Sequence, residues 1–96
     1  MPAFDGRKLW FVGIGGAGMS ALAVVTRAWG AEVAGWDRHE KPYLEQLADV
    51  EIAISPSPPS TPAGWEPVVS TAYAGLVSGQ SRGELLAELE IGRAHV

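Results

Sequence analysis

A glycine-rich segment near the amino end of the sequence has the residue types and spacing for phosphate chemistry. Residues 13–18 read Gly-Ile-Gly-Gly-Ala-Gly and fit the pattern G-x-G-x-x-G. In that pattern the first glycine makes a tight turn, the second lets a phosphate approach the backbone, and the third packs a helix on a strand. A diphosphate there meets free backbone N–H groups and the positive end of a helix dipole. The segment predicts a nucleotide site, and the alternative is a tight turn that uses glycine only for its geometry.

An acidic residue further along the chain supports the nucleotide interpretation. Asp37 follows Gly18 by 19 residues and comes directly after the apolar segment 32–36. A carboxylate at that place can accept hydrogen bonds from ribose hydroxyls. Asp37 also begins the tetrapeptide Asp-Arg-His-Glu, whose spacing suits a helix cap, so capping is the alternative role.

Other reactive residue types give weaker signals. Ser70 and Thr71 follow an apolar segment and could contact a ligand, but serine and threonine are also ordinary turn residues. His39 and His95 lack partners at metal-ligand spacing, and we expect both at the surface. The sequence has no cysteine, which excludes a disulfide framework, a thiolate zinc site and a cysteine nucleophile. It also has no G-x-x-x-x-G-K-[ST] motif, so we predict neither catalytic residues nor a metal site in this chain.

Alternating strands and helices must position these residues. Short apolar segments rich in β-forming residues predict strands over 8–13, 32–36, 51–54 and 67–70, with a stub of a fifth strand at 76–77. Apolar residues at helical spacing predict helices over 15–29, over 42–48 and after Ser81. Gly30 is a natural end for the first helix, and Ser81 and Glu84 have capping-box spacing. This order predicts an α/β fold, a Rossmann-like open parallel sheet of four to five strands with helices on both faces.

Length and composition fit one domain over residues 1–96. Hydrophobic residues make up 47% and charged residues 19% of the sequence, which is typical of globular proteins. A net charge of −4 argues against a nucleic-acid partner. The longest uncharged run, residues 9–26, contains four glycines, which argues against a signal peptide or a membrane span. We therefore expect a cytoplasmic protein with no membrane partner.

Four sequence segments occur in a familiar order across nearly the whole chain. They are FVGIGGAGMS at 11–20, GWD at 35–37, VVSTA at 68–72 and SRGELLAEL at 81–89. In these segments the chain resembles the N-terminal domain of the Mur ligase family, most closely the UDP-N-acetylmuramate–L-alanine ligases. Met19, directly after G-G-x-G, makes the match more specific than a general dinucleotide pattern.

The resemblance implies a domain that holds the UDP part of UDP-N-acetylmuramate or a related UDP-sugar. It implies diphosphate contacts at Gly13, Gly15, Gly16, Ala17, Gly18, Met19 and Ser20. It implies ribose or uracil contacts at Asp37 and Trp36, and possible further substrate contacts at Ser70, Thr71, Ala72 and Arg82.

The resemblance also implies what the rest of such a ligase does. In the family a central domain, which opens with a P-loop, binds ATP and Mg²⁺ and phosphorylates the muramoyl carboxylate, and the amine of L-alanine attacks the acyl phosphate. We therefore expect this chain to hold no cofactor, to bind substrate without catalysing alone, and to work with the remaining ligase domains. The implied pathway is peptidoglycan biosynthesis, which serves the cell wall, cell shape and cell division.

The sequence departs from the family pattern at three places, and two other functions are alternatives to UDP-sugar binding. Trp36 replaces a serine, Ser55-Pro56-Ser57 replaces a Gly-His turn, and the stretch 72–81 is shorter, which predicts the loss of a helix. An NAD(P)-binding domain of an oxidoreductase or redox sensor shares the glycine pattern and Asp37, but it does not explain Met19 and Ser20. A degenerate standalone regulatory module is the other alternative.

Overall fold

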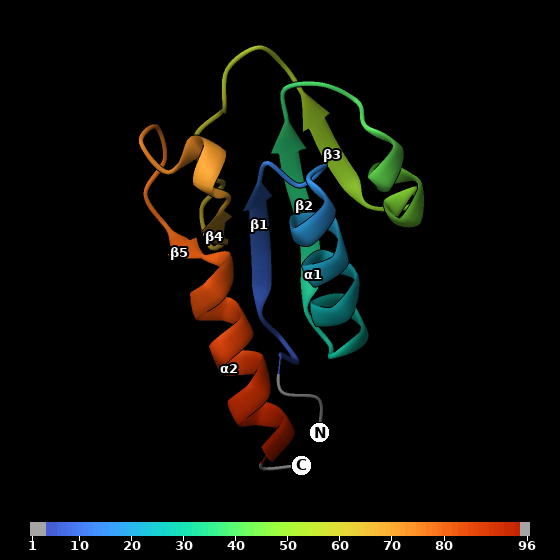
Figure 1. Cartoon of the computed structure of the whole chain (residues 1–96), viewed down its shortest axis with the longest axis vertical. Helices are drawn as coiled ribbons and strands as arrows, with labels where there is room; N and C mark the ends of the chain where they lie inside the picture. Colours follow the sequence, from blue (N-terminus) through green and yellow to red (C-terminus); the bar gives the residue numbers. More distant parts are fainter. Residues whose placement is uncertain (1–3, 95–96) are drawn as a thin grey trace.

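The computed structural model describes residues 4–94, and for residues 91–94 it describes the backbone alone. Five parallel strands form one open sheet in the order β3-β2-β1-β4-β5 (Figure 1). The strands are β1 (Lys8–Val12), β2 (Glu32–Asp37), β3 (Glu51–Ile54), β4 (Glu66–Val69) and β5 (Gln80–Ser81). The helical segments are α1 (Ala17–Ala28), α2 (Arg82–Ala94) and two 3-10 helices, η1 (Pro42–Leu47) and η2 (Thr71–Tyr73). The predicted Rossmann-like parallel α/β sheet is confirmed.

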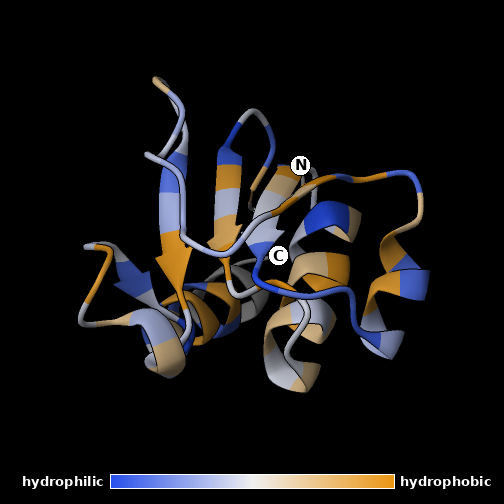
Figure 2. Cartoon of the chain, turned by 90° about the horizontal axis from the view of Figure 1, so that it is seen from above, coloured by the Kyte–Doolittle hydropathy of each residue, from blue (hydrophilic) through white to orange (hydrophobic). Residues whose placement is uncertain are grey.

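Strand β1 lies at the centre of the sheet because its side chains are apolar on both faces. Leu9 and Phe11 belong to the apolar cluster on one face, and Trp10 and Val12 belong to the cluster on the other. All four side chains are buried, as expected for a parallel strand that is covered on both sides. In Figure 2 the neighbouring strands β1 and β4 run from hydrophilic residues at their tails to hydrophobic residues at their arrowheads.

The two faces of the sheet are covered differently. On one face α1 packs against both η1 and α2, and all three cover the cluster around Phe11 and Leu85. On the other face Trp36 packs edge-on against Tyr73 of η2, and Trp65 from the proline-rich connection adds to the cover. On this second face the predicted helical cover is only the three-residue η2, which agrees with the predicted loss of a helix from the short stretch before α2.

The fifth strand lies further along the chain than predicted. Pairing with β4 begins at Gln80, whereas the predicted stub at 76–77 forms a turn in which the Leu76 side chain is 66% exposed. Gly79 explains the shift, since a Cβ atom there would lie 2.7 Å from the carbonyl oxygen of Pro67. The chain meets β4 at this glycine, so the ladder starts after it.

The helix boundaries follow the predicted local signals. Gly30 adopts φ +102° directly after the last turn of α1, and Pro42 lies in the first turn of η1. The Ser81 N–H donates to Glu84 Oε1 and the Glu84 N–H donates to Ser81 Oγ, each at 3.1 Å, so the predicted capping box is confirmed. Within residues 4–94, no helix combines the length and the hydropathy that a bilayer span needs.

Candidate functional site

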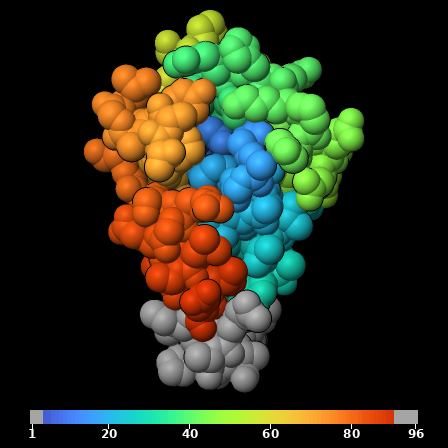
Figure 3. All heavy atoms as spheres, in the orientation of Figure 1, coloured from blue at the N-terminus to red at the C-terminus, as the bar shows by residue number. Residues whose placement is uncertain are grey.

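A crevice opens at the carboxyl ends of β1 and β4, where the strand order reverses. The chain leaves β1 for β2 on one side and later returns to β4 on the other, so the loops after β1 and β4 diverge. The loop after β1 contains residues 13–18, called the glycine loop below, and Ser70 and Thr71 follow β4. Figure 3 shows the region of the glycine loop, in blue, recessed between the orange segment that follows β4 and the green segment that precedes β3.

The protein itself holds the first half of the glycine loop. Gly13 adopts φ +87°, a left-handed conformation that favours glycine, and its N–H donates to the Trp36 carbonyl at 2.8 Å. The Ile14 N–H donates to the same carbonyl at 3.1 Å, and the Gly15 N–H donates to Asp37 Oδ2 at 2.7 Å. These three N–H groups donate to acceptors within the protein, so they fix the conformation of the loop and are not free to bind a ligand.

The second half of the glycine loop leads into α1, and the N–H groups in the first turn of this helix are free. Gly16 is the N-cap, no side chain caps the helix, and its first turn has no acidic residue. Among the described residues, the N–H groups of Ala17, Gly18 and Met19 have no acceptor. Together with the helix dipole, they favour an anion at this end of α1.

A hollow of about 290 Å³ adjoins these N–H groups. It is lined by Gly16, Gly18, Met19, Ser70, Thr71 and Arg82, and all six were predicted from the sequence as diphosphate or substrate contacts. Gly18 has a different neighbour from the one expected for the third glycine of the pattern. A Cβ atom on it would lie 2.6 Å from Arg82 Nη1, so Gly18 makes room for a guanidinium and not for a strand.

Arg82 supplies the positive charge of this hollow. It is the first residue of α2, directly after the capping serine, and its side chain is exposed. Among the described side chains Arg82 forms no ion pair, whereas Arg7 pairs with Glu66 and Glu88. The hydrogen bond to Glu66 is the main cause that raises the pKa of Arg7 above its ordinary value. The charge of Arg82 is thus available to a bound anion.

Ser20, Ala72 and Trp36 were also predicted as contacts, and none of them lines the hollow. Ser20 is fully buried and its hydroxyl donates to the Ala17 carbonyl at 3.1 Å, while Ala72 is exposed in η2 away from the hollow. Trp36 is fully buried among the side chains of the second face, and its Nε1–H donates to Ser55 Oγ at 2.8 Å. In this structure Trp36 has no exposed surface with which to meet a nucleoside.

Asp37 is fully buried beneath the glycine loop. Its Oδ2 accepts the Gly15 N–H, and its Oδ1 accepts the Arg38 N–H at 2.7 Å and lies 3.1 Å from Lys41 Nζ. The alternative role in helix capping is wrong, because the next helix begins at Pro42 with Lys41 as its N-cap. The ribose contact stays a prediction. Lys41 was missed from the sequence, where its spacing of four residues from Asp37 was the available signal.

The two histidines and the acidic residues give no metal site in the described part of the chain. His39 is exposed, as predicted, and His95 lies outside the described residues. Across residues 4–94, no group of three or more histidine, aspartate or glutamate side chains is placed to hold a metal ion.

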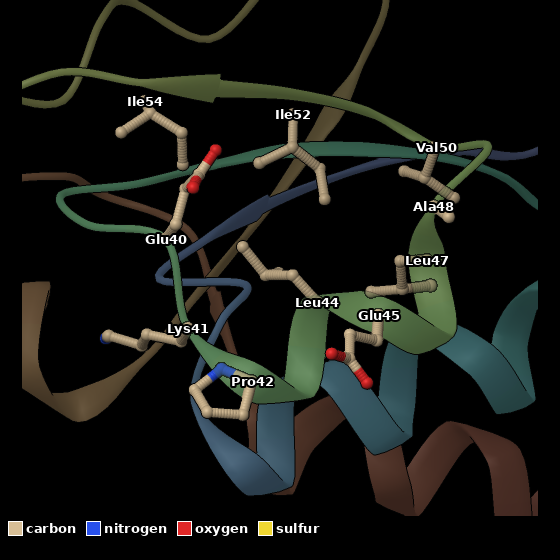
Figure 4. A pocket seen from close by; sticks show the side chains of 10 residues that line it. All are labelled: Glu40, Lys41, Pro42, Leu44, Glu45, Leu47, Ala48, Val50, Ile52 and Ile54. Carbon is tan, nitrogen blue, oxygen red and sulfur yellow. The ribbon is translucent and has the colours of Figure 1, made fainter.

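A larger hollow of about 510 Å³ lies between η1 and β3 (Figure 4). Most of its lining residues are of apolar types, and Leu44 of η1 faces Ile52 of β3. Lys41 lies at the end nearest the glycine loop, where its Cδ is 3.0 Å from the position of a Cβ on Gly15. None of the residues predicted as ligand contacts lines this groove, so the residue types and the geometry together favour the smaller hollow.

Comparison with known proteins gives consistent matches. The family model described as "Mur ligase family, catalytic domain" matches residues 8–91. A UDP-N-acetylmuramate–L-alanine ligase of Francisella philomiragia is 38% identical over 64 residues, which are 66% of this chain and 14% of that protein. Ligases of the same name match at 43% identity in Thermosynechococcus vestitus (56% of this chain, 11% of that protein) and Cyanothece sp. PCC 7425 (60% and 12%). The matched part of this chain therefore spans less than a sixth of each relative.

Proposed function

Because the chain belongs to the Mur ligase family, we propose that its glycine loop and Arg82 bind the diphosphate of a UDP-linked sugar, UDP-N-acetylmuramate or a close relative of it. The observation that carries this proposal is the hollow at the start of α1. Three free N–H groups and a guanidinium without an acidic partner among the described side chains meet there from two separate elements. Charge-assisted hydrogen bonds from such donors suit phosphate oxygens.

The size of the hollow fits a diphosphate better than a whole nucleotide sugar. Its volume of about 290 Å³ lies at the lower end of the range for small-molecule pockets. In the proposed complex the phosphate oxygens accept hydrogen bonds from the N–H groups of α1, and Ser70 and Thr71 line the β4 side of the hollow. The sugar and the nucleoside then extend from the hollow along the carboxyl edge of the sheet.

We propose that the chain acts as part of an ATP-dependent UDP-N-acetylmuramate–L-alanine ligase, as the names of the relatives suggest. In that role the chain supplies substrate binding, and ATP and Mg²⁺ bind to residues of the remaining ligase domains. The amide bond formed with L-alanine belongs to peptidoglycan biosynthesis in the cytoplasm.

An NAD(P)-binding domain is the less favoured candidate. It would use Asp37 as a ribose ligand, whereas both carboxylate oxygens of Asp37 already accept protein donors and the side chain is fully buried. The relatives named above are ligases.

Thermal unfolding of the 96-residue chain in the presence of ligands tests the proposal. UDP-N-acetylmuramate, UDP and inorganic diphosphate are expected to raise the midpoint, since a ligand at 100 times its Kd adds about 2.7 kcal/mol of stability. Uridine, which has no phosphate, is the matched control and should not change the midpoint. A larger shift with NADH than with UDP would support the dinucleotide candidate, and no shift with any nucleotide would contradict both.

A further inference from the structure

Asp37 is a buried carboxylate that the function proposed above does not use. We propose that Asp37 is a positioning residue that fixes the glycine loop for phosphate, with Lys41 as its counter-ion, and that it is not a ligand of the ribose. The inference rests on the proposed function, because the loop that Asp37 positions is the proposed diphosphate site.

The burial of Asp37 is compensated by donors of the protein. A buried carboxylate is costly unless it is paired and hydrogen-bonded. Here Oδ2 accepts the Gly15 N–H, while Oδ1 accepts the Arg38 N–H and lies beside the ammonium of Lys41. Each oxygen is therefore satisfied without a ligand, and no part of the side chain is exposed to one.

The contact between Asp37 and Gly15 holds the middle of the glycine loop. The neighbouring N–H groups of Gly13, Ile14 and Gly16 donate to backbone carbonyls, so Asp37 is the side chain that accepts from the loop. The approach is close, because a Cβ atom on Gly15 would lie 2.7 Å from Asp37 Oδ2. With Gly15 fixed in this way, the loop enters α1 in an orientation that leaves the N–H groups of its first turn free.

Lys41 keeps the charge of Asp37 from acting on the bound anion. A carboxylate beneath a diphosphate site repels the ligand unless a cation offsets it, since the interaction is Coulombic and acts through a poorly solvated region. Lys41 Nζ lies 3.1 Å from Asp37 Oδ1, and Lys41 stands at one end of the groove in Figure 4. The pair is close to neutral, so the positive charge of Arg82 acts on the anion with little opposition from Asp37.

This arrangement predicts that the diphosphate contributes to the binding affinity and that the ribose hydroxyls make no contact with Asp37. The wild-type chain should bind UDP and 2′,3′-dideoxy-UDP with affinities within about twofold of each other, measured by isothermal titration. A tenfold or greater preference for UDP would overturn the inference and make Asp37 a ribose ligand.

A variant separates the two roles with a probe that has no ribose. Asp37→Ala should lower the affinity for inorganic diphosphate and for UDP by the same factor, because the loop loses its orientation and the ammonium of Lys41, left without its carboxylate, acts on both ligands alike. The matched control is Asp49→Ala, which removes an exposed carboxylate paired with Arg27 and should leave both affinities unchanged. If Asp37→Ala weakened UDP binding but not diphosphate binding, the positioning role would be wrong.

Two further measurements cover the cases in which the first variant gives no answer. If Asp37→Ala does not fold, Lys41→Gln can be used, because it keeps the carboxylate and its bond to Gly15 but removes the cation. Lys41→Gln should lower the diphosphate affinity several-fold, and an unchanged affinity would contradict the counter-ion role. Where the wild type binds neither diphosphate nor UDP, the proposed function fails, and the Gly15 amide resonance decides this inference instead. That resonance should move upfield in Asp37→Asn, and a folded variant with the wild-type shift would contradict the contact.

Discussion

Gly35 on β2 lies against the backbone carbonyl of Phe11 on β1 so closely that a Cβ atom on Gly35 would overlap the carbonyl oxygen. The two residues are register partners in the parallel ladder, and the same Cβ would lie 3.0 Å from Ile14 Cδ1 at the start of the glycine loop. The absence of a side chain at Gly35 therefore sets how β1, β2 and the glycine loop come together.

Gly35→Ala is expected to destabilise the fold. The added methyl group overpacks the junction against backbone, which cannot move as a side chain can, so the free energy of unfolding should fall by about 1–3 kcal/mol. Urea denaturation measures the change. Gly75→Ala is the control, because a Cβ there meets nothing within 4 Å and its effect should stay within about 0.5 kcal/mol. Equal stability of the two variants would contradict the close approach.

Gly18→Ala is expected to separate binding from folding. The new Cβ meets the guanidinium of Arg82, the far end of a flexible side chain that can shift. Stability should hold or rise by up to about 1 kcal/mol, since alanine favours a helix over glycine, while UDP affinity should fall. Thermal unfolding and titration of the same sample measure both. A fall of several kcal/mol in the free energy of unfolding would instead support the helix-on-strand packing role that the glycine pattern predicts for Gly18.

Arg82→Ala is expected to weaken UDP binding by about tenfold or more, because a charge-assisted hydrogen bond contributes roughly 1.5–3 kcal/mol and each 1.4 kcal/mol is a factor of ten. Binding should also depend less on salt, since the variant has lost a charge. Titration at two salt concentrations tests this. Arg27→Ala removes an arginine that pairs with Asp49 and lines no part of the hollow, so it should bind UDP as the wild type does.

The features that could be predicted from the sequence are those determined by residues close together in the chain. The four longer strands, the end of α1 at Gly30 and the capping box at Ser81 depend on neighbours within a few residues, and the structure confirms them. The glycine loop could be located because its spacing is tied to one turn between a strand and a helix.

Features that depend on the register between strands were not accessible to the sequence. The parallel pairing of β1 with β2 decides that Gly35 meets Phe11 and that Trp36 turns to the second face. The sharp bend after β2 decides that Lys41 returns to Asp37. The position of β5 followed from the contact of Gly79 with Pro67, which no periodic pattern records.

Ser81→Ala is expected to reduce both stability and ligand affinity. Losing a helix cap costs about 0.5–2 kcal/mol, and the cap also fixes the turn that presents Arg82. Ser78→Ala, at an exposed position before β5, is the control. Thermal unfolding with and without UDP measures the two effects. A Ser81→Ala variant as stable as the control would show that the capping bonds do not contribute in solution.

The stability of the chain is expected to fall in acid through Glu88. The hydrogen bond from Arg7, at 2.7 Å, is the main cause that lowers the pKa of Glu88 below its ordinary value of about 4.5. Below that ordinary value the unfolded state binds more protons than the folded state, so the stabilisation is complete above it and is lost as the pH falls through the lowered pKa. Urea denaturation at several pH values should show a shallower acid loss in Glu88→Gln. An identical slope in variant and wild type would contradict this assignment.

The hollow beside the glycine loop is built from two segments that lie far apart in the sequence. Gly16, Gly18 and Met19 come directly after β1, whereas Ser70, Thr71 and Arg82 arrive only once β4 has paired with β1 across a long connection. Closing such a connection is entropically costly and slow compared with forming the local β1-α1-β2 unit. A diphosphate that requires both walls cannot bind a half-assembled chain. Ligand-induced changes in fluorescence or chemical shift during refolding would therefore report the rate at which β4 and β5 join the sheet.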